Sequence, residues 1–384
     1  MKVLITSPTY PPFNSGLGNV AQQQAAALVR KGWTVVVATG GSKRLTRSDP
    51  DSGATVEEFN VRGSDSLLQP LGGDVASYEQ FLVKSSFDVV LLNAWQTWST
   101  DLALRALRRI NARVFVFSNC VSTNLFLSRQ PLRSLLRYLA WRPYWMRMAR
   151  RMEQLDGLIF VSEEGCDSRF DDLEMAKRIG ISYSVIQNPL SEKTVNFFES
   201  HSAGVVRDQL LAVGSYHWTK GHDFVLRAYA GSHAKNRIKL KIIGQKFTTY
   251  TDKLRRLAES LHISSDFLSF HENVPVDELL NEYAKAIVFL YGSHTECQPL
   301  VLVDAMAAGT PFVSRASGCI PFLTGGLAVR KEAEAATAID YLLDDGNARL
   351  QLSLAGRNEA NSRHHPEVFA ESLNDVLQGA EIKG

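Results

Sequence analysis

The first half of the chain repeats one pattern, in which short and continuous apolar runs are separated by longer mixed segments. The runs are rich in Val, Ile, Leu and Phe and are too short for typical helices, which predicts buried strands. We expect strands over residues 2–6, 33–39, 88–93, 113–119, 157–162 and 183–188, and a helix over 19–32. Continuous apolar strands that alternate with helices are typical of a parallel sheet covered on both faces.

The same pattern begins again after residue 205. Strands are expected over 209–215, 238–244, 267–272, 286–293 and 310–316, with helices over 223–231, 251–261, 277–286 and 301–309. The polar segment 188–205 between the two halves is the expected linker.

The predicted fold class is therefore α/β, with two doubly wound, Rossmann-like domains over 1–190 and 205–355. Residues 356–384 form a helical tail, which is a candidate to pack back on the first domain. Ligands of open α/β sheets bind outside the carboxyl ends of the strands, so two such sheets predict a ligand site in a cleft between the domains.

Length and composition agree with two globular domains, since 384 residues exceed one ordinary core and 45% of the residues are apolar. The apolar run at the N-terminus is too short for a signal peptide, and no run is long enough to span a membrane. The four cysteines form no CxxC or Cys/His pattern. We therefore expect a cytoplasmic protein without a metal site.

Positive charge is concentrated in residues 125–155, which carry seven arginines and a single acid, Glu153. Between 129 and 151 the arginines alternate with Trp, Tyr, Leu and Met, a composition that suits the inner face of an anionic membrane. The alternative is a surface helix whose arginines extend over the fold while its aromatic rings pack inward. Pro143 argues against one straight helix. The charge pattern does not indicate binding to nucleic acid.

Two loops carry candidate phosphate-binding residues. Gly16 and Gly18 lack a Cβ atom and precede a helix, so a phosphate could approach the backbone there, although an ordinary tight turn explains them equally well. Lys220 stands before Gly221 at the end of an expected strand. A lysine in that position can neutralise a diphosphate, or it is a solvated loop residue.

Two acids lie in the segment SHTECQPLVLVDAMAAGTPFV. Glu296 is in the loop after an expected strand, and Asp304 lies about two turns later in the helix that begins near Pro299. A carboxylate in an otherwise apolar helix needs a hydrogen-bond partner, and a sugar or ribose hydroxyl is suitable. The alternative for Asp304 is an acid that only solubilises the helix.

This segment resembles the signature S-x-x-E-x-x-P-L-x-L-x-(E/D)-A-M-A-x-G-x-P-x-V of the family 4 retaining glycosyltransferases, which share the GT-B fold. The glycine loop at 15–19, LDGLIFVSE at 155–163, VIQNP at 185–189, VGSYHWTKG at 213–221 and KIIGQ at 241–245 follow in the family's order. The resemblance covers residues 3 to about 330. It implies transfer of a sugar from a UDP- or GDP-sugar to a glycan or lipid-linked glycan in polysaccharide or glycoconjugate biosynthesis, without a metal or other cofactor.

The resemblance also implies roles for individual residues. Gly16 and Gly18 approach the donor diphosphate, Lys220 binds it, and Glu296 contacts the transferred sugar. The backbone amides of Cys297, Gln298 and Leu300 hold donor oxygens, and Asp304 takes the place of the acid that binds the ribose.

The chain departs from the family at three positions. Ser215 replaces an arginine of the diphosphate site, and Asp304 is shorter than the usual glutamate. Asn119 stands where many members have a histidine near the transfer centre. These changes leave open an alternative function, a catalytically degenerate GT-B domain that binds nucleotide or glycan or acts as a scaffold for a partner enzyme.

Overall fold

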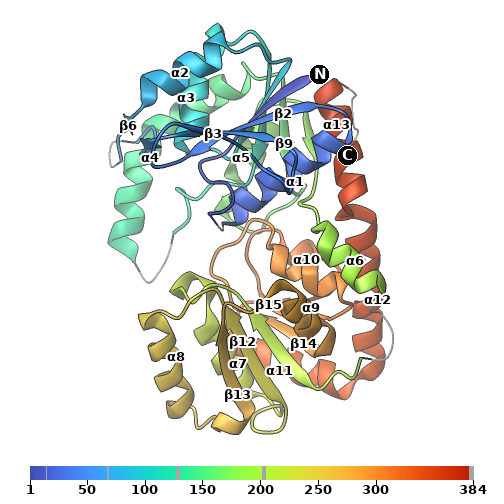
Figure 1. Cartoon of the computed structure of the whole chain (residues 1–384). Helices are drawn as coiled ribbons and strands as arrows, with labels where there is room; N and C mark the ends of the chain where they lie inside the picture. Colours follow the sequence, from blue (N-terminus) through green and yellow to red (C-terminus); the bar gives the residue numbers. More distant parts are fainter. Residues whose placement is uncertain (14, 67–68, 127–129, 201–204, 380–384) are drawn as a thin grey trace. The chain divides into compact units, whose positions relative to one another are not determined.

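The computed structural model describes residues 1–13, 15–66, 69–126, 130–200 and 205–379. Their contacts divide the chain into two compact units, one formed by Met1–Pro189 with Pro366–Gly384 and the other by Leu190–His365. Each unit is built around one mainly parallel sheet with helices packed on it (Figure 1). The α/β class and the doubly wound architecture expected from the sequence are confirmed.

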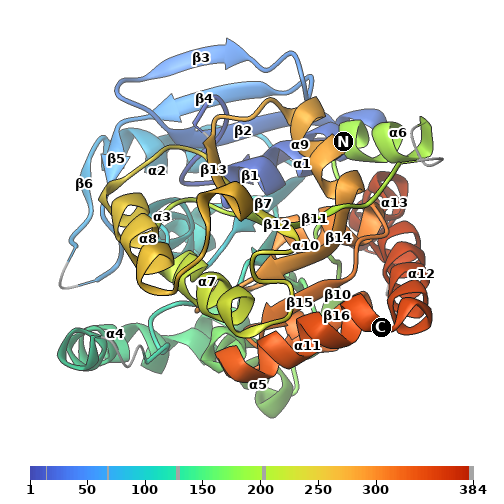
Figure 2. The ribbon, with the colours of Figure 1, turned by 90° about the horizontal axis from the view of Figure 1, so that it is seen from below.

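The first unit contains an eight-stranded sheet in which only the pairing of β3 with β4 is antiparallel. These two strands form one edge of the sheet, which is clear in Figure 2. The central strands are fully buried, because helices cover both of their faces. In spatial order the strands are β10 (Tyr183–Val185), β9 (Gly157–Phe160), β8 (Arg113–Ser118), β7 (Val89–Asn93), β1 (Lys2–Thr6), β2 (Thr34–Gly40), β4 (Thr55–Phe59) and β3 (Leu45–Ser48).

The helices of the first unit come from both ends of the chain. The C-terminal helix α13 (Pro366–Gln378) packs against α1 (Gly16–Arg30) (Figure 1). The indole N–H of Trp33 donates to Asn374 of α13 at 2.9 Å, and Phe369 packs edge-on against Phe117 of β8. The remaining helices are α2 (Val75–Lys84), α3 (Trp98–Ala106), α4 (Pro131–Met152) and α5 (Asp171–Ile179), and a small hairpin is formed by β5 (Val61–Arg62) and β6 (Gly72–Gly73).

The second unit contains a six-stranded sheet that is parallel throughout. In spatial order its strands are β13 (Leu268–Glu272), β12 (Lys239–Gly244), β11 (Gln209–Val213), β14 (Ala286–Tyr291), β15 (Phe312–Arg315) and β16 (Gly326–Val329). Its helices are α6 (Glu192–Ser200), α7 (His222–Gly231), α8 (Thr249–Ser260), α9 (Val276–Lys285), α10 (Leu300–Ala307), α11 (Glu332–Asp344) and α12 (Gly346–Arg363).

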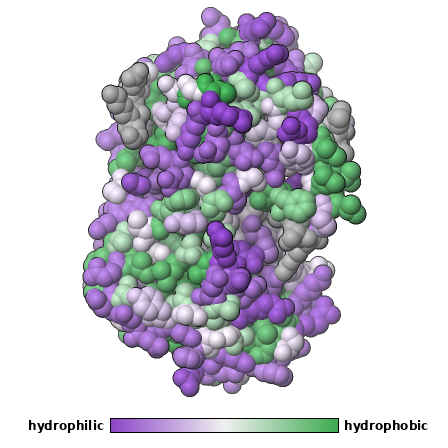
Figure 3. All heavy atoms as spheres, turned by 180° about the vertical axis from the view of Figure 1, so that it is seen from behind, coloured by the Kyte–Doolittle hydropathy of each residue, from purple (hydrophilic) through white to green (hydrophobic). Residues whose placement is uncertain are grey.

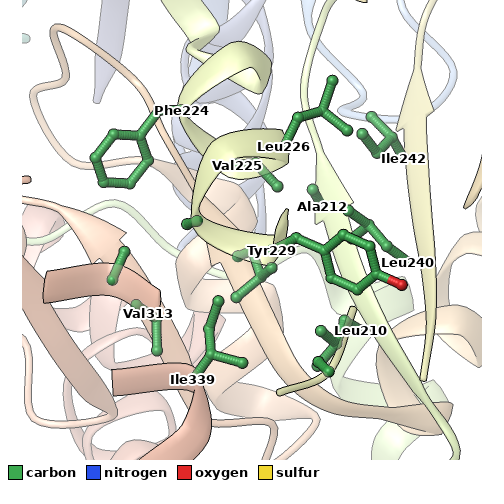
Figure 4. Packing of buried hydrophobic residues seen from close by; sticks show 14 of the residues in the cluster. Leu210, Ala212, Phe224, Val225, Leu226, Tyr229, Leu240, Ile242, Val313 and Ile339 are labelled. Carbon is green, nitrogen blue, oxygen red and sulfur yellow. The ribbon is translucent and has the colours of Figure 1, made fainter. Parts of the chain in front are cut away.

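The core of the second unit lies between this sheet and helices α7 and α11. Figure 4 shows Leu210, Leu240 and Val313 of the strands packed against residues of both helices. Tyr229 reaches through this layer, and its hydroxyl donates to the carbonyl of Ile238 at 2.9 Å. The core therefore fixes the position of β11 and α7, which carry one of the candidate loops between them.

Several elements differ from the expectation. Helix α6 occupies half of the segment expected to be a linker, and it begins where Ser191 accepts a hydrogen bond from the amide of Thr194. Residues 201–204 of that segment lie outside the described residues. The expected domain boundary at residue 355 falls inside α12. Helix α4 continues through Pro143 as one helix. Within the described ranges, no helix is long and apolar enough to cross a membrane.

The contact between α13 and the first unit can be tested by a core substitution. Leu373 of α13 is fully buried, so Leu373→Ala should lower the free energy of unfolding by about 2–5 kcal/mol. Leu354 of α12 is about half exposed at 48%, and Leu354→Ala should cost less than about 1 kcal/mol. Urea unfolding followed by circular dichroism measures both, and equal losses for the two variants would contradict the assignment.

Candidate functional site

Two loops of the second unit approach each other at a pair of glycines. Gly221 adopts a left-handed conformation with φ of 62°, and a Cβ atom there would overlap the carbonyl oxygen of Gly292. A Cβ atom at Gly292 would likewise overlap the carbonyl oxygen of Gly221. Only glycine allows this approach of the two backbones. The loop after β11 and the loop after β14 are consequently in direct contact.

Hydrogen bonds reinforce the contact between these loops. The carbonyl of Thr219 accepts from the amide of His294 at 2.8 Å and from the hydroxyl of Ser293 at 3.1 Å. Thr219 belongs to a 3-10 turn over Trp218–Lys220 that precedes Gly221. The turn therefore presents the next residue, Lys220, to the loop after β14.

Lys220 and Glu296 form an ion pair at this contact, with 2.7 Å between Nζ and Oε1. The same oxygen accepts from the hydroxyls of Tyr291 at 2.5 Å and Ser293 at 2.7 Å. Burial and the neighbouring carboxylate of Glu296 raise the pKa of Tyr291 well above its ordinary value, so Tyr291 remains a donor. Only 12% of the Glu296 side chain is exposed. Three donors on one oxygen hold this carboxylate in a fixed orientation.

The backbone after Glu296 is held from the other side by Gly318. This residue has φ of 56°, and a Cβ atom on it would overlap the carbonyl oxygen of Glu296. The amide of Cys319 donates to the carbonyl of Cys297 at 3.1 Å, and Gln298 is buried. Helix α10 then begins at Leu300. The amide of Leu302 donates to the carbonyl of Pro299 at 3.0 Å, whereas the amides of Leu300 and Val301 have no acceptor within the helix. This helix end is suited to bind an anion.

Asp304 lies in α10 and faces α6 of the same unit. Its Oδ1 accepts from the hydroxyl of Thr194 over a long distance of 3.4 Å. Burial raises the pKa of the Asp304 carboxyl to about 7, and the Thr194 hydrogen bond acts in the opposite direction. Asp304 is therefore an incompletely satisfied acid that a second hydroxyl donor would stabilise in its charged form.

The loop after β11 contains Ser215, which is exposed. Its neighbour on the other side of the turn, His222, is buried, and the Nε2 atom of its ring lies 3.1 Å from the carbonyl oxygen of Gly214. Burial lowers the pKa of His222 to about 4, so this ring is neutral at pH 7. An additional cation that the sequence did not single out, Arg315 at the end of β15, contacts the ring of His294 and lies 3.7 Å from Glu332.

In the first unit, Gly16 and Gly18 lie in the first turn of α1. The hydroxyl of Ser15 accepts from the amide of Gly18 at 3.0 Å, and a Cβ atom on Gly18 would lie only 2.9 Å from that hydroxyl. Gly18 is therefore needed by the protein's own packing. A Cβ atom on Gly16, in contrast, would meet no atom within 4 Å, so this backbone is open to approach.

Asn119 follows β8 and joins a buried amide network. Its Nδ2 donates to Oδ1 of Asn93 at 3.4 Å, and Asn93 exchanges two hydrogen bonds with Gln24 of α1 at 2.7 and 3.0 Å. The network connects the helix that begins with Gly16 to the ends of β7 and β8. The sequence did not point to Gln24 and Asn93, because neither side-chain amide belongs to a recognisable motif.

Backbone strain is concentrated at the same edge of the sheet. Ala94, Gln96 and Cys120 have φ angles of 61°, 62° and 63° without being glycines. Such residues cost on the order of 1–3 kcal/mol each and cluster at functional sites. The backbone N–H of Gln96 donates to the hydroxyl of Tyr144 at 3.2 Å, and this hydrogen bond holds Gln96 in its conformation.

The structure thus forms two groups from the predicted residues. Lys220, Glu296 and the segment 297–300 come together in the second unit, and Asp304 and Ser215 lie in elements next to them. Gly16, Gly18 and Asn119 lie around the carboxyl edge of the first sheet. Among the residues that the structure describes, no group of three or more His, Cys, Asp or Glu side chains could hold a metal ion.

Comparison with known proteins agrees with this arrangement. Residues 15–165 match the glycosyl transferase 4-like domain, and residues 196–359 match the glycosyl transferases group 1. A human relative, GDP-Man:Man(3)GlcNAc(2)-PP-Dol alpha-1,2-mannosyltransferase, is 28% identical over 219 residues, which are 52% of this chain and 44% of the relative. The chain spans less than half the length of the curated relatives it matches.

Solved structures share the fold over nearly the whole chain. Sucrose-phosphate synthase from Thermosynechococcus elongatus has a TM-score of 0.76 at 17% identity, covering 98% of both chains. HepE of Anabaena, solved in complex with UDP, has a TM-score of 0.69 at 15% identity, covering 98% of this chain and 100% of that one. At these identities the likeness concerns the fold.

The raised pKa of Asp304 predicts a pH dependence of stability. The acid ionises near pH 3.8 when unfolded and near 7 when folded, so the stability that it contributes is complete below about pH 3.8 and is lost as the pH rises through about 7. Asp304→Asn removes this loss. Relative to the wild type, the variant should therefore gain on the order of 3 kcal/mol between pH 4.5 and 7.5. Urea unfolding across this range measures the difference, and parallel pH profiles would disprove the burial of Asp304.

Proposed function

We propose that this chain, which belongs to the group 1 glycosyltransferases of the GT-B fold, transfers a hexosyl unit from a UDP- or GDP-sugar to a glycan or lipid-linked glycan in polysaccharide or glycoconjugate biosynthesis. The observation that carries the proposal is the cluster of Lys220, Tyr291 and Ser293 around Glu296. A nucleotide sugar presents an anionic diphosphate beside a hydroxylated ring, and this cluster offers a cation beside a carboxylate. The UDP complex of HepE, which shares the fold, supports a nucleotide donor.

Each residue of the second unit has a role in this proposal. Lys220 neutralises the diphosphate, and the amides of Cys297, Gln298 and Leu300 donate to its oxygens at the start of α10. Glu296 accepts a hydroxyl of the transferred sugar through Oε2, because its three protein donors all bind Oε1. Asp304 binds a ribose hydroxyl, which replaces the long hydrogen bond from Thr194.

Transfer proceeds with retention of the anomeric configuration in this proposal. The bond between the sugar and the diphosphate breaks while the acceptor oxygen attacks from the same face, and the departing phosphate takes the acceptor's proton. The protein then needs no general base. Asn119 donates a hydrogen bond to the sugar without titrating, and Gly16 leaves room for the diphosphate beside the start of α1. Lysine and backbone amides supply the charge stabilisation that a metal ion would otherwise give.

The acceptor side of the proposal places the chain at the inner face of a membrane through α4. The exposed side of this helix carries an apolar stripe, formed by Leu132, Leu135, Leu136, Leu139, Pro143 and Met146. At 3.6 residues per turn these six positions fall within an arc of about 100°. The buried residues Trp141, Tyr144 and Met148 lie on the opposite side of the helix. The helix is thus apolar on two opposite sides. Only the side with Trp141, Tyr144 and Met148 is buried against the rest of the unit.

The charges around the apolar stripe favour an anionic lipid surface as its partner. Arg142 and Arg147 are exposed on its two flanks, and α4 contains no acid. Figure 3 shows apolar side chains gathered at the margin of the molecule over α4. Leucines that enter the acyl region, with arginines at the level of the head groups, are typical of interfacial helices. Arg129, which belongs to the predicted segment, lies outside the described residues.

Matched substitutions of two ion pairs test the donor site. Glu296→Gln should lower kcat for sugar transfer at least about 100-fold, because it weakens an interaction made in the transition state. Glu282 forms a comparable pair with Lys241 at 2.6 Å in the same unit, and Glu282→Gln should keep activity within about threefold. A thermal-shift screen with UDP, GDP and ADP and their sugars first identifies the donor.

The outcomes separate the proposed function from its alternative. Full activity of Glu296→Gln would refute the site assignment, and loss of activity on addition of EDTA would refute the absence of a catalytic metal. Inversion at the anomeric carbon, observed by NMR of the product, would refute the retaining mechanism. Nucleotide binding without hydrolysis or transfer would favour a degenerate GT-B domain, which the exposed Ser215 at the expected arginine position would explain.

Membrane association is tested on the apolar stripe itself. Replacing Leu136 and Leu139 together with Glu should weaken binding to vesicles that contain phosphatidylglycerol at least about tenfold, because two leucines no longer enter the bilayer. Leu350 and Leu354 of α12 are exposed to a similar degree, and their double replacement with Glu serves as the control. Vesicle sedimentation at low and high salt measures binding. Equal binding by both double variants would exclude α4 as the docking element.

A further inference from the structure

A pocket with a volume of about 530 Å³ opens between α4 and α5 in the first unit. Helix α4 contributes Tyr138, Arg142 and Trp145 to its wall, and α5 contributes Asp171, Glu174 and Arg178. The roles proposed above for Gly16, Gly18, Asn119 and the apolar stripe leave this pocket unassigned. Its lining combines two aromatic rings with two carboxylates and two guanidinium groups.

The pocket lies directly beside the apolar stripe. On α4, Tyr138 and Arg142 occupy the arc between the stripe and the buried face, and Met146 belongs both to the stripe and to the pocket wall. Arg142 is next to the stripe, whereas Trp145 is next to the buried face. Trp145 and Asp171 are less exposed than Arg142, so a molecule that enters from the lipid surface meets the guanidinium group first and these two side chains deeper in the pocket.

The polar groups of the pocket are partly matched by the protein, and Glu174 pairs with Lys177 of the same helix at 3.2 Å. Asn124 donates from Nδ2 to Asp171 at 2.6 Å, while its Oδ1 is buried and has no hydrogen-bond partner among the described residues. Burial and the neighbouring acids Asp167 and Glu174 raise the pKa of Asp171. Arg142 donates to the hydroxyl of Tyr138 at 3.1 Å and stacks over its ring. Buried oxygen atoms of this kind are stabilised by hydroxyl donors.

We propose that this pocket binds the head group of a lipid in which a sugar or cyclitol ring is joined to the lipid by a phosphate. The phosphate contacts Arg142 at the edge of the apolar stripe, and the acyl or prenyl chains remain in the bilayer. The ring hydroxyls donate to Asp171, Glu174 and Oδ1 of Asn124, and Trp145 and Tyr138 offer their faces to the ring. The inference rests on the proposed membrane location and identifies the class of acceptor lipid.

The pocket is connected to the proposed transfer site by one short loop. Asn119 and Asn124 belong to the segment that follows β8, and five residues of chain reach at most about 18 Å. Thr123 anchors this loop, since its hydroxyl accepts from the indole of Trp145 at 3.0 Å and from Gln96 at 2.6 Å. A lipid-linked glycan of a few residues can therefore keep its lipid-proximal ring in the pocket while its far end approaches Asn119.

Vesicles of equal charge test this proposal without knowledge of the natural acceptor. Phosphatidylinositol carries a cyclitol on its phosphate and phosphatidylglycerol does not, although both carry one negative charge. At equal mole fractions the full-length protein should bind phosphatidylinositol vesicles at least about threefold more tightly, because additional hydrogen bonds form to charged groups. Arg142→Gln and Glu174→Gln should each abolish this preference.

Arg147→Gln is the matched control, because it removes the same charge from the opposite flank of the apolar stripe without touching the pocket. It should weaken binding to both vesicles and preserve their ratio. Glycerophosphoinositol, which has the same head group without acyl chains, should bind at least about tenfold more weakly than the lipid in vesicles. Equal affinity would mean that the site takes a soluble ring phosphate, and it would overturn the assignment to a lipid.

The remaining outcomes separate this proposal from the function on which it rests. A ratio of one in the wild type, or a preference that survives in both pocket variants, overturns the pocket assignment and leaves donor hydrolysis and membrane binding unaffected. Binding to neither vesicle overturns both the pocket and the membrane location. Urea unfolding of Arg142→Gln and Glu174→Gln, with midpoints equal to that of the wild type, shows that both variants fold.

Discussion

The close approach of Gly221 and Gly292 is the constraint on which the site in the second unit depends. Each residue would collide with the other's carbonyl if it carried a Cβ atom. This approach lets Lys220 and Glu296, which are 76 residues apart, form an ion pair of 2.7 Å. Tyr291 and Ser293 then bind the same carboxylate oxygen, so the orientation of Glu296 is decided by backbone contact as much as by its own hydrogen bonds.

The carboxyl edge of the sheet in the first unit is built differently. There the chain carries strained left-handed residues after β7 and β8 and a buried network of the amides of Gln24, Asn93 and Asn119. Amides do not change charge with pH, so this network stays intact over a wide range. The second unit thus holds a rigid ion pair at this edge of its sheet, and the first unit holds a neutral network of hydrogen bonds at its own.

The sequence predicts those parts of the fold in which local pattern and burial coincide. The central strands are continuous apolar runs and could be located from the sequence within a few residues. Strands β3 and β4 were not expected, because segments such as TVEEF of β4 mix polar and apolar positions. Helix α6 was taken for a linker, and so the partner of Asp304, Thr194, was missed together with it.

The site was predicted in a similarly uneven way. Glu296 and Lys220 were singled out by their positions after expected strands and by a resemblance in motif order. Their direct contact and their contacts with Tyr291 and Ser293 became visible only in the structure. The apolar stripe of α4 shows the limit most clearly. Periodicity identifies two apolar sides of this helix, but only packing decides that Trp141 and Tyr144 face the core while Leu136 faces solvent.

The return of α13 to the first unit makes the second unit an insertion within the first. The chain passes between the units twice, at residues 189–190 and 365–366. A double connection favours hinge rotation over free tumbling. It also sets an order during synthesis: the inserted unit is complete on the ribosome before α13 emerges, and the first unit, although begun earlier, closes its core last.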